Sequence, residues 1–420
     1  MLTADQNTRL TQTSAGTPMG VLLRRYWHPV AASDQLDDEN PTREIRILSE
    51  DLVLFRSASG EIGLIEPSCP HRKANLSYGV PEPEGIRCAY HGWLFDVNGN
   101  CLDQPSEPVG SRFKDKVKLK AYPTQELGGL IFAYMGPAPA PVLPKWDIFM
   151  WDNVKRYVNW AMLPCNWLQC MDNSLDPVHF QWLHNYWGSY VLGRDNPPEK
   201  RAAWRANMGT RGRHELKVGF DRFEYGVIKR RLMVGDTEDD EWWRIGHPVL
   251  FPNILRVGQR RNHAFQMRIP VDDTHTLHIL YRVEVPPIGE DAPPQDGVPS
   301  TELNIYDDKG RVRADYVVGQ DQAAWIIQGA ITDRTTEALG VTDVGIIMYR
   351  KILEEQLRIV EDGGDPLNVH REDKGVIFLP QEHSFYPGYT ETGGPFRDKP
   401  LLPPEVETKL AGEITVDLTS

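Results

Sequence analysis

Short runs of alternating apolar and polar residues fill the first third of the chain. They predict strands between Thr42 and about Tyr134, for example at Glu44–Leu48, Leu52–Phe55, Ile62–Ile65 and Leu130–Tyr134. Pairs of residues that favour turns, such as Ser59-Gly60 and Asn98-Gly99, separate these runs. This part of the sequence therefore predicts a small all-β domain.

Prolines then interrupt the pattern over residues 136–144, Gly-Pro-Ala-Pro-Ala-Pro-Val-Leu-Pro. Such a stretch is stiff and poor in backbone donors, so we interpret it as a linker. The predicted parts are an N-terminal segment 1–41, the β domain 42–136 (the front domain), the linker 137–145 and a larger domain 146–420 (the rear domain).

The rear domain mixes both periodicities. Its first helical pattern runs from Pro164 to Trp187. Alternation from about Trp204 to Val285 predicts strands, including Phe223–Ile228, Asn253–Val257 and Thr276–Val283. Beyond the proline-rich surface loop 286–299, two helices are predicted at Gly319–Gly329 and Asp343–Glu361, with Asp343 as the N-cap of the second. The fold class is α+β, with an antiparallel sheet and helices in the rear domain.

Composition narrows the function classes. A chain of 420 residues with 25% charged and 40% hydrophobic residues is an ordinary globular protein of two or three domains. The net charge of −13 argues against nucleic acid as a partner. The polar start of the chain and the lack of a long apolar run predict neither export nor a membrane span. Five cysteines without a pairing pattern favour a reducing cytoplasm.

Two short pairs carry metal chemistry. Cys69-Pro-His71 and Cys88-Ala-Tyr-His91 supply two thiolates and two imidazoles, with 16 residues between the pairs. This is the ligand set of a Rieske [2Fe–2S] centre, in which two Cys hold one iron and two His the other. The same four residues could instead hold a structural zinc ion.

The residues around both pairs resemble the loops of Rieske ferredoxins and Rieske oxygenases. Respiratory-complex Rieske proteins carry an extra Cys in each loop, and Ala74 and Tyr90 stand in those places here. The resemblance is therefore to the oxygenase and ferredoxin branch.

A polar stripe marks the first helical pattern of the rear domain. It comprises Asn166, Gln169, Asn173, Asp176 and His179, at steps of three and four residues. The large apolar residues beside it can pack as core; they are Trp167, Met171, Leu175 and Val178. The stripe should therefore be buried and paired.

His179 and His184 are five residues apart, which leaves the two rings roughly 140° apart on a regular helix. They could share an ion only if the helix widens into a π-type turn or ends between them. Pro177 also perturbs the helix just upstream. From spacing alone, a purely structural role for both His stays open.

A family resemblance covers nearly the whole chain. The run Asp172-Asn-Ser-Leu-Asp176-Pro-Val-His179, four residues and then His184, resembles the mononuclear-iron motif of Rieske non-haem iron oxygenase α subunits. Arg25–Val30 and Gln328–Asp343 resemble the phthalate-dioxygenase-like branch of that family. The resemblance implies an all-β Rieske domain in front of a helix-grip-like catalytic domain.

The resemblance also implies site residues. His179, His184 and a downstream carboxylate would hold one Fe(II) as a 2-His-1-carboxylate triad. We assign the carboxylate to Asp321, at the start of a predicted amphipathic helix. Asp333, which could pair with Arg334, and Asp343, which looks like a helix cap, are the alternatives.

Asp176 has a separate implied role. It would accept hydrogen bonds from an iron-binding His and from a cluster-binding His of a neighbouring subunit, so that His91 of one chain faces Asp176 of the next. A homotrimer or a hexamer follows from this arrangement. The alternative reading of Asp176 is simple support of His179.

The substrate contacts are open. An aromatic carboxylate needs an arginine for bidentate contact, and the candidates are Arg205, Arg244, Arg256 and Arg268. We expect structural or surface roles for the remaining histidines, His28, His247, His263, His275 and His278. Trp242-Trp243 is expected to fill core.

The expected function is terminal oxygenation of an aromatic acid with O₂. No dinucleotide-binding loop is visible, so electrons would come from NAD(P)H through a separate reductase or ferredoxin. We favour O-demethylation of a methoxylated, lignin-derived aromatic acid, of which the 5,5′-dehydrodivanillate type is one case. The alternative is cis-dihydroxylation of a phthalate- or chlorobenzoate-type substrate. A Rieske electron carrier and a zinc-stabilised binding protein are the alternatives from other classes.

Overall fold

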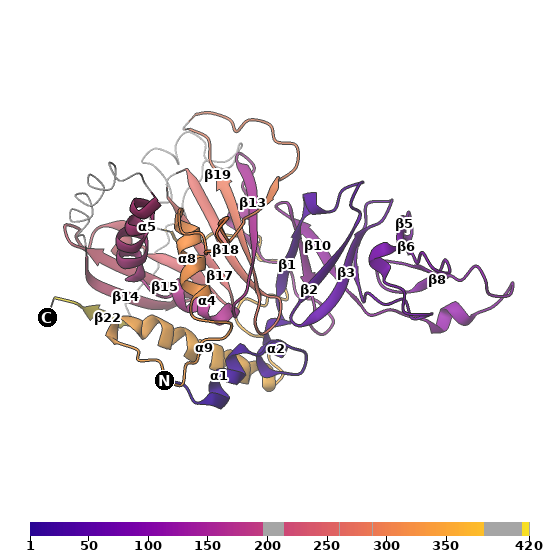
Figure 1. Ribbon diagram of the computed structural model, residues 1–420, viewed down its shortest axis with the longest axis horizontal. Coiled ribbons are helices and arrows are strands. Elements are labelled where there is room, and N and C mark those ends of the chain that lie inside the picture. Colours follow the sequence, from indigo (N-terminus) through magenta and orange to yellow (C-terminus); the bar gives the residue numbers. More distant parts are fainter. Residues whose placement is uncertain (196–213, 260, 288, 382–413, 420) are drawn as a thin grey trace.

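The structure is a computed structural model that describes residues 1–195, 214–259, 261–287, 289–381 and 414–419. The molecule is elongated, with the front domain at one end and the rear domain at the other (Figure 1). Two helices, α1 (Ala4–Thr11) and α2 (Pro18–Leu23), precede both and pack under the rear domain.

The front domain holds three small sheets, as its alternating pattern predicts. One pairs β1 (Trp27–Ala32), β11 (Leu130–Tyr134) and β10 (Thr124–Leu127). The second has the order β2 (Thr42–Ile47), β3 (Glu50–Arg56), β4 (Ile62–Ile65) and β9 (Ala121–Tyr122). The third, at the tip of the molecule, has the order β5 (Val80–Glu82), β6 (Gly85–Arg87), β7 (Leu94–Phe95) and β8 (Cys101–Asp103). The domain boundaries that the sequence predicts, at residues 41, 136 and 145, stay predictions.

The rear domain is built on a nine-stranded sheet of order β20-β13-β19-β18-β17-β16-β15-β14-β22. Its strands are antiparallel except where β20 joins β13. In chain order they are β13 (Lys155–Leu163), β14 (Glu215–Phe223), β15 (Gly226–Met233), β16 (His247–Leu250), β17 (Ile254–Gln259), β18 (Asn262–Pro270), β19 (Thr276–Glu284), β20 (Ser300–Glu302) and β22 (Ile414–Asp417). A short parallel pair, β12 (Lys145–Trp146) with β21 (Val376–Ile377), lies apart from it.

Helices complete the rear domain, and α4, α5 and α8 lie over one face of the large sheet (Figure 1). They are α3 (Asp147–Met150), α4 (Trp167–Ser174), the π-helix η4 (Phe180–Trp187), α5 (Gly188–Asp195), α7 (Glu241–Arg244), α8 (Val317–Ile326) and α9 (Val344–Glu361). Four 3₁₀ turns are η1 (Ser33–Gln35), η2 (Leu76–Tyr78), η3 (Phe113–Lys116) and η5 (Val341–Asp343). The predicted α+β class is confirmed.

Three expectations differ from the structure. The helical run over 164–187 is broken at Leu175–Val178, because Pro177 cannot continue α4. The expected strand Phe223–Ile228 is a hairpin, in which Glu224 and Tyr225 form the turn between β14 and β15. β13 lies in a stretch for which the pattern predicted no strand. Trp204, where the alternating pattern was expected to begin, lies outside the described residues.

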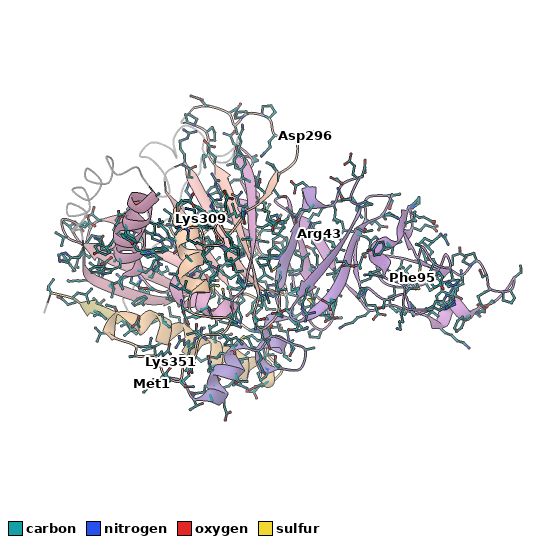
Figure 2. All side chains as sticks on the ribbon, viewed as in Figure 1. Met1, Arg43, Phe95, Asp296, Lys309 and Lys351 are labelled. Atoms are coloured by element: carbon teal, nitrogen blue, oxygen red, sulfur yellow. The ribbon has the colours of Figure 1, made fainter. Side chains whose placement is uncertain are left out.

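Packing ties the two domains together (Figure 2). One large apolar cluster includes residues of β1 and β11 as well as the core of the rear domain, whereas the tip of the front domain has its own cluster around Phe55 and Phe95. The guanidinium of Arg43 lies 5.5 Å from the ring centre of Trp160 across the junction. The linker is also packed, since Trp27 Nε1 donates to the carbonyl of Pro141. No helix in the described parts of the chain has the length and apolarity needed to cross a membrane.

Candidate metal centres

The two loops at the tip of the front domain share one backbone design. Cys69 N–H donates to the Ala74 carbonyl, and Cys88 N–H donates to the Trp93 carbonyl. Each Cys carbonyl then accepts from the residue four positions on, Lys73 or Gly92, at 2.8 and 3.0 Å. Both of those residues have a left-handed backbone, with φ of 61° and 73°. Each loop is thus a tight turn held by its own backbone hydrogen bonds.

Sulfur lies inside and imidazole outside. Cys69 and Cys88 are buried in the tip cluster, while the rings of His71 and His91 lie at the surface with centres 4.4 Å apart. Burial and the adjacent Cys88 thiol raise the pKa of Cys69 to about 11. Two buried thiols without a partner cation are costly to ionise, and bound iron would remove that cost by taking both as thiolates.

The arrangement favours two irons over one zinc ion. A tetrahedral zinc site needs its donor atoms to converge on one point. In the described part of the chain, three or more metal-binding side chains come within 4.8 Å of one another only at a different place, in the rear domain. The front loops instead hold a thiol pair and an imidazole pair, which fits a [2Fe–2S] rhomb.

The second centre begins where α4 ends. Asn166 caps α4 by accepting from Leu168 N–H, and Gln169 is buried with its amide bonded to the carbonyls of Trp325 and Gly329. The polar stripe is therefore buried and paired at these positions, as predicted. After the break at Pro177, the chain resumes as the π-helix η4.

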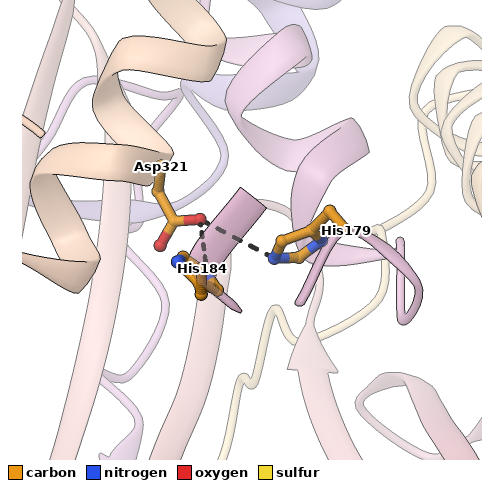
Figure 3. A group of neighbouring side chains, drawn as sticks. All are labelled: His179, His184 and Asp321. Atoms are coloured by element: carbon orange, nitrogen blue, oxygen red, sulfur yellow. Dashed lines mark ion pairs between the residues drawn. The ribbon is translucent and has the colours of Figure 1, made fainter. Parts of the chain in front are cut away.

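The π-helix decides whether the two histidines meet. Its wider turn brings His179 and His184, five residues apart, onto one side, with ring centres 5.3 Å apart. Asp321 reaches them from α8 (Figure 3). Its Oδ1 lies 3.3 Å from His184 Nε2 and 3.7 Å from His179 Nε2.

These three side chains suit a ferrous ion. Their donor atoms all lie within 4.8 Å of one another, and Asp321 Oδ1 is buried without a hydrogen-bond donor among the described residues. Burial alone would raise the pKa of Asp321, but the His184 and His179 imidazoles outweigh it, so the pKa is lowered. The pKa of His184 is raised, because Asp321 outweighs the effect of burial. Two imidazoles with one carboxylate are the ligands of a facial triad that leaves iron positions open.

Comparisons with known proteins agree with both centres. The sequence matches the Rieske [2Fe-2S] domain family over residues 26–123. It is 40% identical to the 5,5'-dehydrodivanillate O-demethylase oxygenase subunit of Sphingobium sp. (strain NBRC 103272 / SYK-6), over 91% of this chain and 87% of that protein. It is 30% identical to the phthalate 4,5-dioxygenase oxygenase subunit of Pseudomonas putida, over 86% and 88%.

This chain belongs to the Rieske non-haem iron oxygenases. It is an oxygenase (α) subunit and an oxidoreductase, with a Rieske cluster and a mononuclear iron. The fold agrees: the structure of Pseudomonas putida CBB5 NdmA aligns with a TM-score of 0.58 at 20% identity, over 85% of this chain and 98% of that one. The electron-carrier and zinc-protein alternatives are thereby excluded.

In this oxygenase His179 and His184 have different outer partners. His179 Nδ1 lies 3.5 Å from Asp176 Oδ2, and Asp176 Oδ1 accepts the backbone N–H groups of Val178 and His179. Although burial opposes it, the His179 imidazole lowers the pKa of Asp176. His184 Nδ1 instead lies 2.9 Å from Gln320 Oε1. We did not anticipate Gln320, and its place next to Asp321 was the available signal.

The rival carboxylates are engaged elsewhere in the oxygenase. Asp333 is exposed and accepts from the amide and hydroxyl of Thr335. The expected Asp333–Arg334 pair is absent, because Arg334 pairs with Asp172 at 2.9 Å. Asp343 stands at the N-cap position of α9, yet its carboxylate accepts from Gly340 N–H instead of capping that helix.

A cavity of about 310 Å³ adjoins the triad. Its lining includes both histidines, Asp321 and a group of polar, basic and aromatic side chains, namely Asp176, Phe180, Lys229, Arg230, Arg231, Trp242 and His247. Arg231 is central, with its guanidinium 4.4 Å from the ring centre of Phe180 and 4.3 Å from that of Trp242.

Three of the four candidate arginines, Arg244, Arg256 and Arg268, do not line this cavity. Arg256 and Arg268 are buried in the sheet, where Arg268 lies 5.2 Å from the ring centre of Trp325. Arg244 is exposed, and Arg205 lies outside the described residues. Trp243 is buried as expected, but Trp242 faces the cavity. The hairpin β14–β15 places Arg231 at the cavity beside the triad. The position of Arg231 in the sequence could not indicate this placement.

Proposed function

We propose that this oxygenase O-demethylates a methoxylated aromatic acid, such as one derived from lignin. The observation that carries the proposal is the 40% identity, over 91% of this chain, to a protein whose name specifies O-demethylation of 5,5'-dehydrodivanillate. That substrate name denotes a methoxylated aromatic acid.

The cavity chemistry supports an anionic aromatic substrate. Arg231 and Lys229 supply positive charge beside the triad, and Phe180 and Trp242 supply flat apolar faces. A guanidinium pairs with a carboxylate in a planar, bidentate way. The volume of about 310 Å³ is at the lower end of the range for small-molecule sites. A substrate of one or two rings held by its carboxylate suits such a cavity.

We assign the two centres by residue. Cys69, Cys88, His71 and His91 would hold the [2Fe–2S] cluster, and His179, His184 and Asp321 would hold Fe(II). When bound, the mononuclear iron supplies O₂ activation at positions that the triad leaves open. The protein side chains orient the substrate: Arg231 holds its carboxylate, and the rings of Phe180 and Trp242 confine it so that the methoxy group faces the triad.

We propose that the oxygenase works as a head-to-tail homotrimer, alone or stacked as a hexamer. The front loops and α8 belong to opposite ends of the molecule, so one chain's cluster is remote from its own triad (Figure 1). In a ring of three, His91 of one chain would face Asp176 of the next. Asp176 would then hold both an iron-side and a cluster-side histidine through its two oxygens.

The electrons would come from NAD(P)H through a separate reductase or ferredoxin. A structure in this fold group is an oxygenase and ferredoxin complex of carbazole 1,9a-dioxygenase, so that relative has such a partner. We also propose a cytoplasmic location, because the five cysteines, all within the described residues, are buried and unpaired.

A second candidate reaction is cis-dihydroxylation of an aromatic carboxylate. It rests on the phthalate 4,5-dioxygenase relative, and on a 3-chlorobenzoate-3,4-dioxygenase oxygenase subunit of Comamonas testosteroni that is 29% identical over 86% of this chain. In that case a ring edge, not a methoxy group, would face the triad.

The test is a product assay. The purified oxygenase receives a reductase and NADH, and is offered aromatic acids in pairs that differ only by a methoxy group. Demethylation releases one formaldehyde for each phenol formed, whereas dihydroxylation forms a diol without formaldehyde. Diol formation from both members of a pair would replace our proposal by the second candidate. An Arg231→Ala variant should raise KM for the acids far more than for their methyl esters.

A further inference from the structure

The front domain carries a basic segment that the proposed function leaves unexplained. Residues 111–120, Ser-Arg-Phe-Lys-Asp-Lys-Val-Lys-Leu-Lys, hold five cationic side chains and one carboxylate, although the whole chain has a net charge of −13. Lys114, Lys116 and Lys118 are exposed. Part of this segment is the turn η3, which lies against β8 at the far end of the front domain (Figure 1).

Nearby carboxylates cancel only part of this charge, and Lys120 is paired with Glu50. Asp115 is paired with Arg112 at 2.8 Å, while Asp103 and Glu82 both pair with Arg87. Glu107 is a further exposed acid in the preceding loop. Among the described residues, Lys116 and Lys118 form no ion pair within 4.0 Å. The surface around η3 is therefore locally positive on an acidic protein.

An exposed aromatic ring lies in the middle of the segment. Phe113 is 46% exposed, and its ring meets Trp93 edge to face at 5.9 Å between centres. Trp93 is buried and stacks on His71, with centres 4.6 Å apart and planes 8° from parallel. Phe113 and Trp93 thus form a continuous line of ring contacts from the surface at η3 to His71, a candidate cluster ligand.

This surface lies on the His71 side of the loops. His91 instead contacts Tyr90, whose ring lies under the guanidinium of Arg72 at 5.1 Å. In the proposed trimer, His91 faces the neighbouring subunit. The η3 side would therefore serve a second partner.

We propose that the surface formed by Arg112, Phe113, Lys114, Lys116 and Lys118 is the docking site of an acidic [2Fe–2S] ferredoxin. This inference rests on the proposed function, which requires an electron donor. Phe113 is the apolar centre of the contact, and the lysines form a charged rim that steers the donor. One electron leaves the ferredoxin, which is oxidised, and reduces the Rieske cluster near Trp93 and His71. No bond is made or broken.

The first test measures binding without turnover. Oxidised plant-type [2Fe–2S] ferredoxin, an acidic protein, is titrated into the oxidised oxygenase by calorimetry at low and at physiological salt. The double variant Lys116→Glu/Lys118→Glu should weaken binding about 10-fold or more at low salt and flatten the salt dependence.

A matched control carries the same charge change elsewhere. Lys309 and Lys351 are exposed on the rear domain (Figure 2), and Lys309→Glu/Lys351→Glu should change the affinity less than about 2-fold. Equal losses in both double variants would overturn the proposal, because net charge and not this surface would then govern binding. Absence of any salt-dependent binding to the unmodified oxygenase would overturn it too.

The second test follows cluster reduction by stopped flow. Phe113→Ala should slow reduction by reduced ferredoxin about 10-fold, since aromatic anchors at the centre of an interface commonly contribute this much. Reduction by dithionite, which needs no docking, should stay unchanged, as should the visible and EPR spectra of the cluster. A Phe113→Ala variant reduced by ferredoxin at the normal rate would exclude η3 as the docking site.

The proposed function and the proposed docking site can each be contradicted without the other. If dithionite-reduced oxygenase forms no product from any aromatic acid in a single turnover, the proposed function is wrong, whatever the docking data. If it forms product but the η3 variants bind and accept electrons normally, only the docking site is wrong.

Discussion

The two metal centres of this oxygenase are built by opposite means. The front loops make their own frame, because each Cys is fixed by hydrogen bonds to residues at most five positions away. The rear triad takes His184 from the π-helix η4, His179 from the N-cap position just before it and Asp321 from α8, which is far away in the chain. A site of the first kind is written in a local motif, whereas a site of the second kind depends on how whole elements pack.

The front loops and the rear triad also differ in how far their side chains are buried. The imidazoles of the front loops lie at the surface, where a second protein can approach them. In the triad Asp321 is buried and both histidines are partly buried. Other charges of the rear domain are buried too: Arg268 lies 5.2 Å from the ring centre of Trp325, and Arg334 and Arg350 hold Asp172. We therefore expect the front centre to tolerate changes elsewhere in the protein, and the rear centre to respond to them.

The largest expected effect separates the two centres completely. Asp321→Ala should lower iron affinity at the triad more than about 100-fold, beyond the effect of losing an outer partner. The Rieske absorbance and EPR signal should stay intact, as they should in His179→Ala. Iron analysis per chain, after anaerobic reconstitution, is the measurement. Asp333→Ala and Asp343→Ala serve as controls, and loss of iron in either one would move the assignment there.

Asp176→Asn tests the link between the centres. We expect turnover to fall about 100-fold while both metal centres remain, since the amide cannot accept from two histidines as a carboxylate does. The measurement is product formation beside the iron content. Turnover at the normal rate in this variant would contradict the bridging role.

Acid should destabilise the rear domain through His278. His278 is fully buried beside Arg268, and burial lowers its pKa to about 3. Below its ordinary pKa near 6.5, the unfolded chain binds a proton that the folded protein refuses, so stability falls as the pH falls. Between pH 6.5 and 5 the loss should be about 2 kcal/mol.

Urea unfolding followed by tryptophan fluorescence would measure this loss. In a His278→Gln variant the free energy of unfolding should depend less steeply on pH. The variant His275→Gln, at an exposed position, should keep the steepness of the unmodified protein. An unchanged slope in His278→Gln would rule out this histidine as the cause.

Gln320 sharpens the contrast within the rear centre. Gln320→Ala removes the acceptor at His184 Nδ1, so the ring loses its fixed tautomer and orientation. Metal affinity should fall about 10-fold, as for other outer partners of metal-binding histidines. Competition against a chelator gives the affinity directly. The control is Gln328→Ala, at an exposed position later in the same part of the chain. An equal fall of metal affinity in this control would contradict a positioning role for Gln320.

The smallest expected effect compares the two front loops. Gly92 has φ of 73°, and a Cβ atom there would lie 3.0 Å from Pro105 Cγ. Gly92→Ala should therefore cost about 1 kcal/mol of stability. Lys73→Ala, at φ of 61° in the matching loop, should change stability by less than about 0.5 kcal/mol, because the position already holds a side chain. Denaturation followed by the absorbance of the cluster measures the stability of both variants. Equal losses of stability in Gly92→Ala and Lys73→Ala would contradict the expected difference.

Sequence reasoning reached the front domain more reliably than the rear one. Alternation located β2, β3, β4 and β11, because strands with one buried face repeat every two residues. It treated the hairpin turn at Glu224-Tyr225 as strand, since Phe223, Tyr225 and Val227 are residue types that favour strands. It also ran one helix through Pro177, where α4 ends and the π-helix begins.

The site residues show the same limit. Cys69, His71, Cys88 and His91 could be nominated from spacing, and the His179–His184 spacing correctly required a π-type turn for the rings to meet. Arg231 was missed because no local pattern marks a residue that reaches a site from a distant strand. Gln320 was missed although it stands next to Asp321, since adjacency in sequence does not show that its side chain meets His184.

By itself, the sequence determined the two metal motifs, the α+β class and the order of the domains, since each depends on residues close together in the chain. Only the tertiary structure decided that Asp321 meets both histidines, that Arg231 faces the cavity and that Phe113 leads through Trp93 to His71. The physical reason is range: hydrogen bonds and periodic burial act over a few residues, whereas convergence at a site is set by the packing of elements that are distant in sequence.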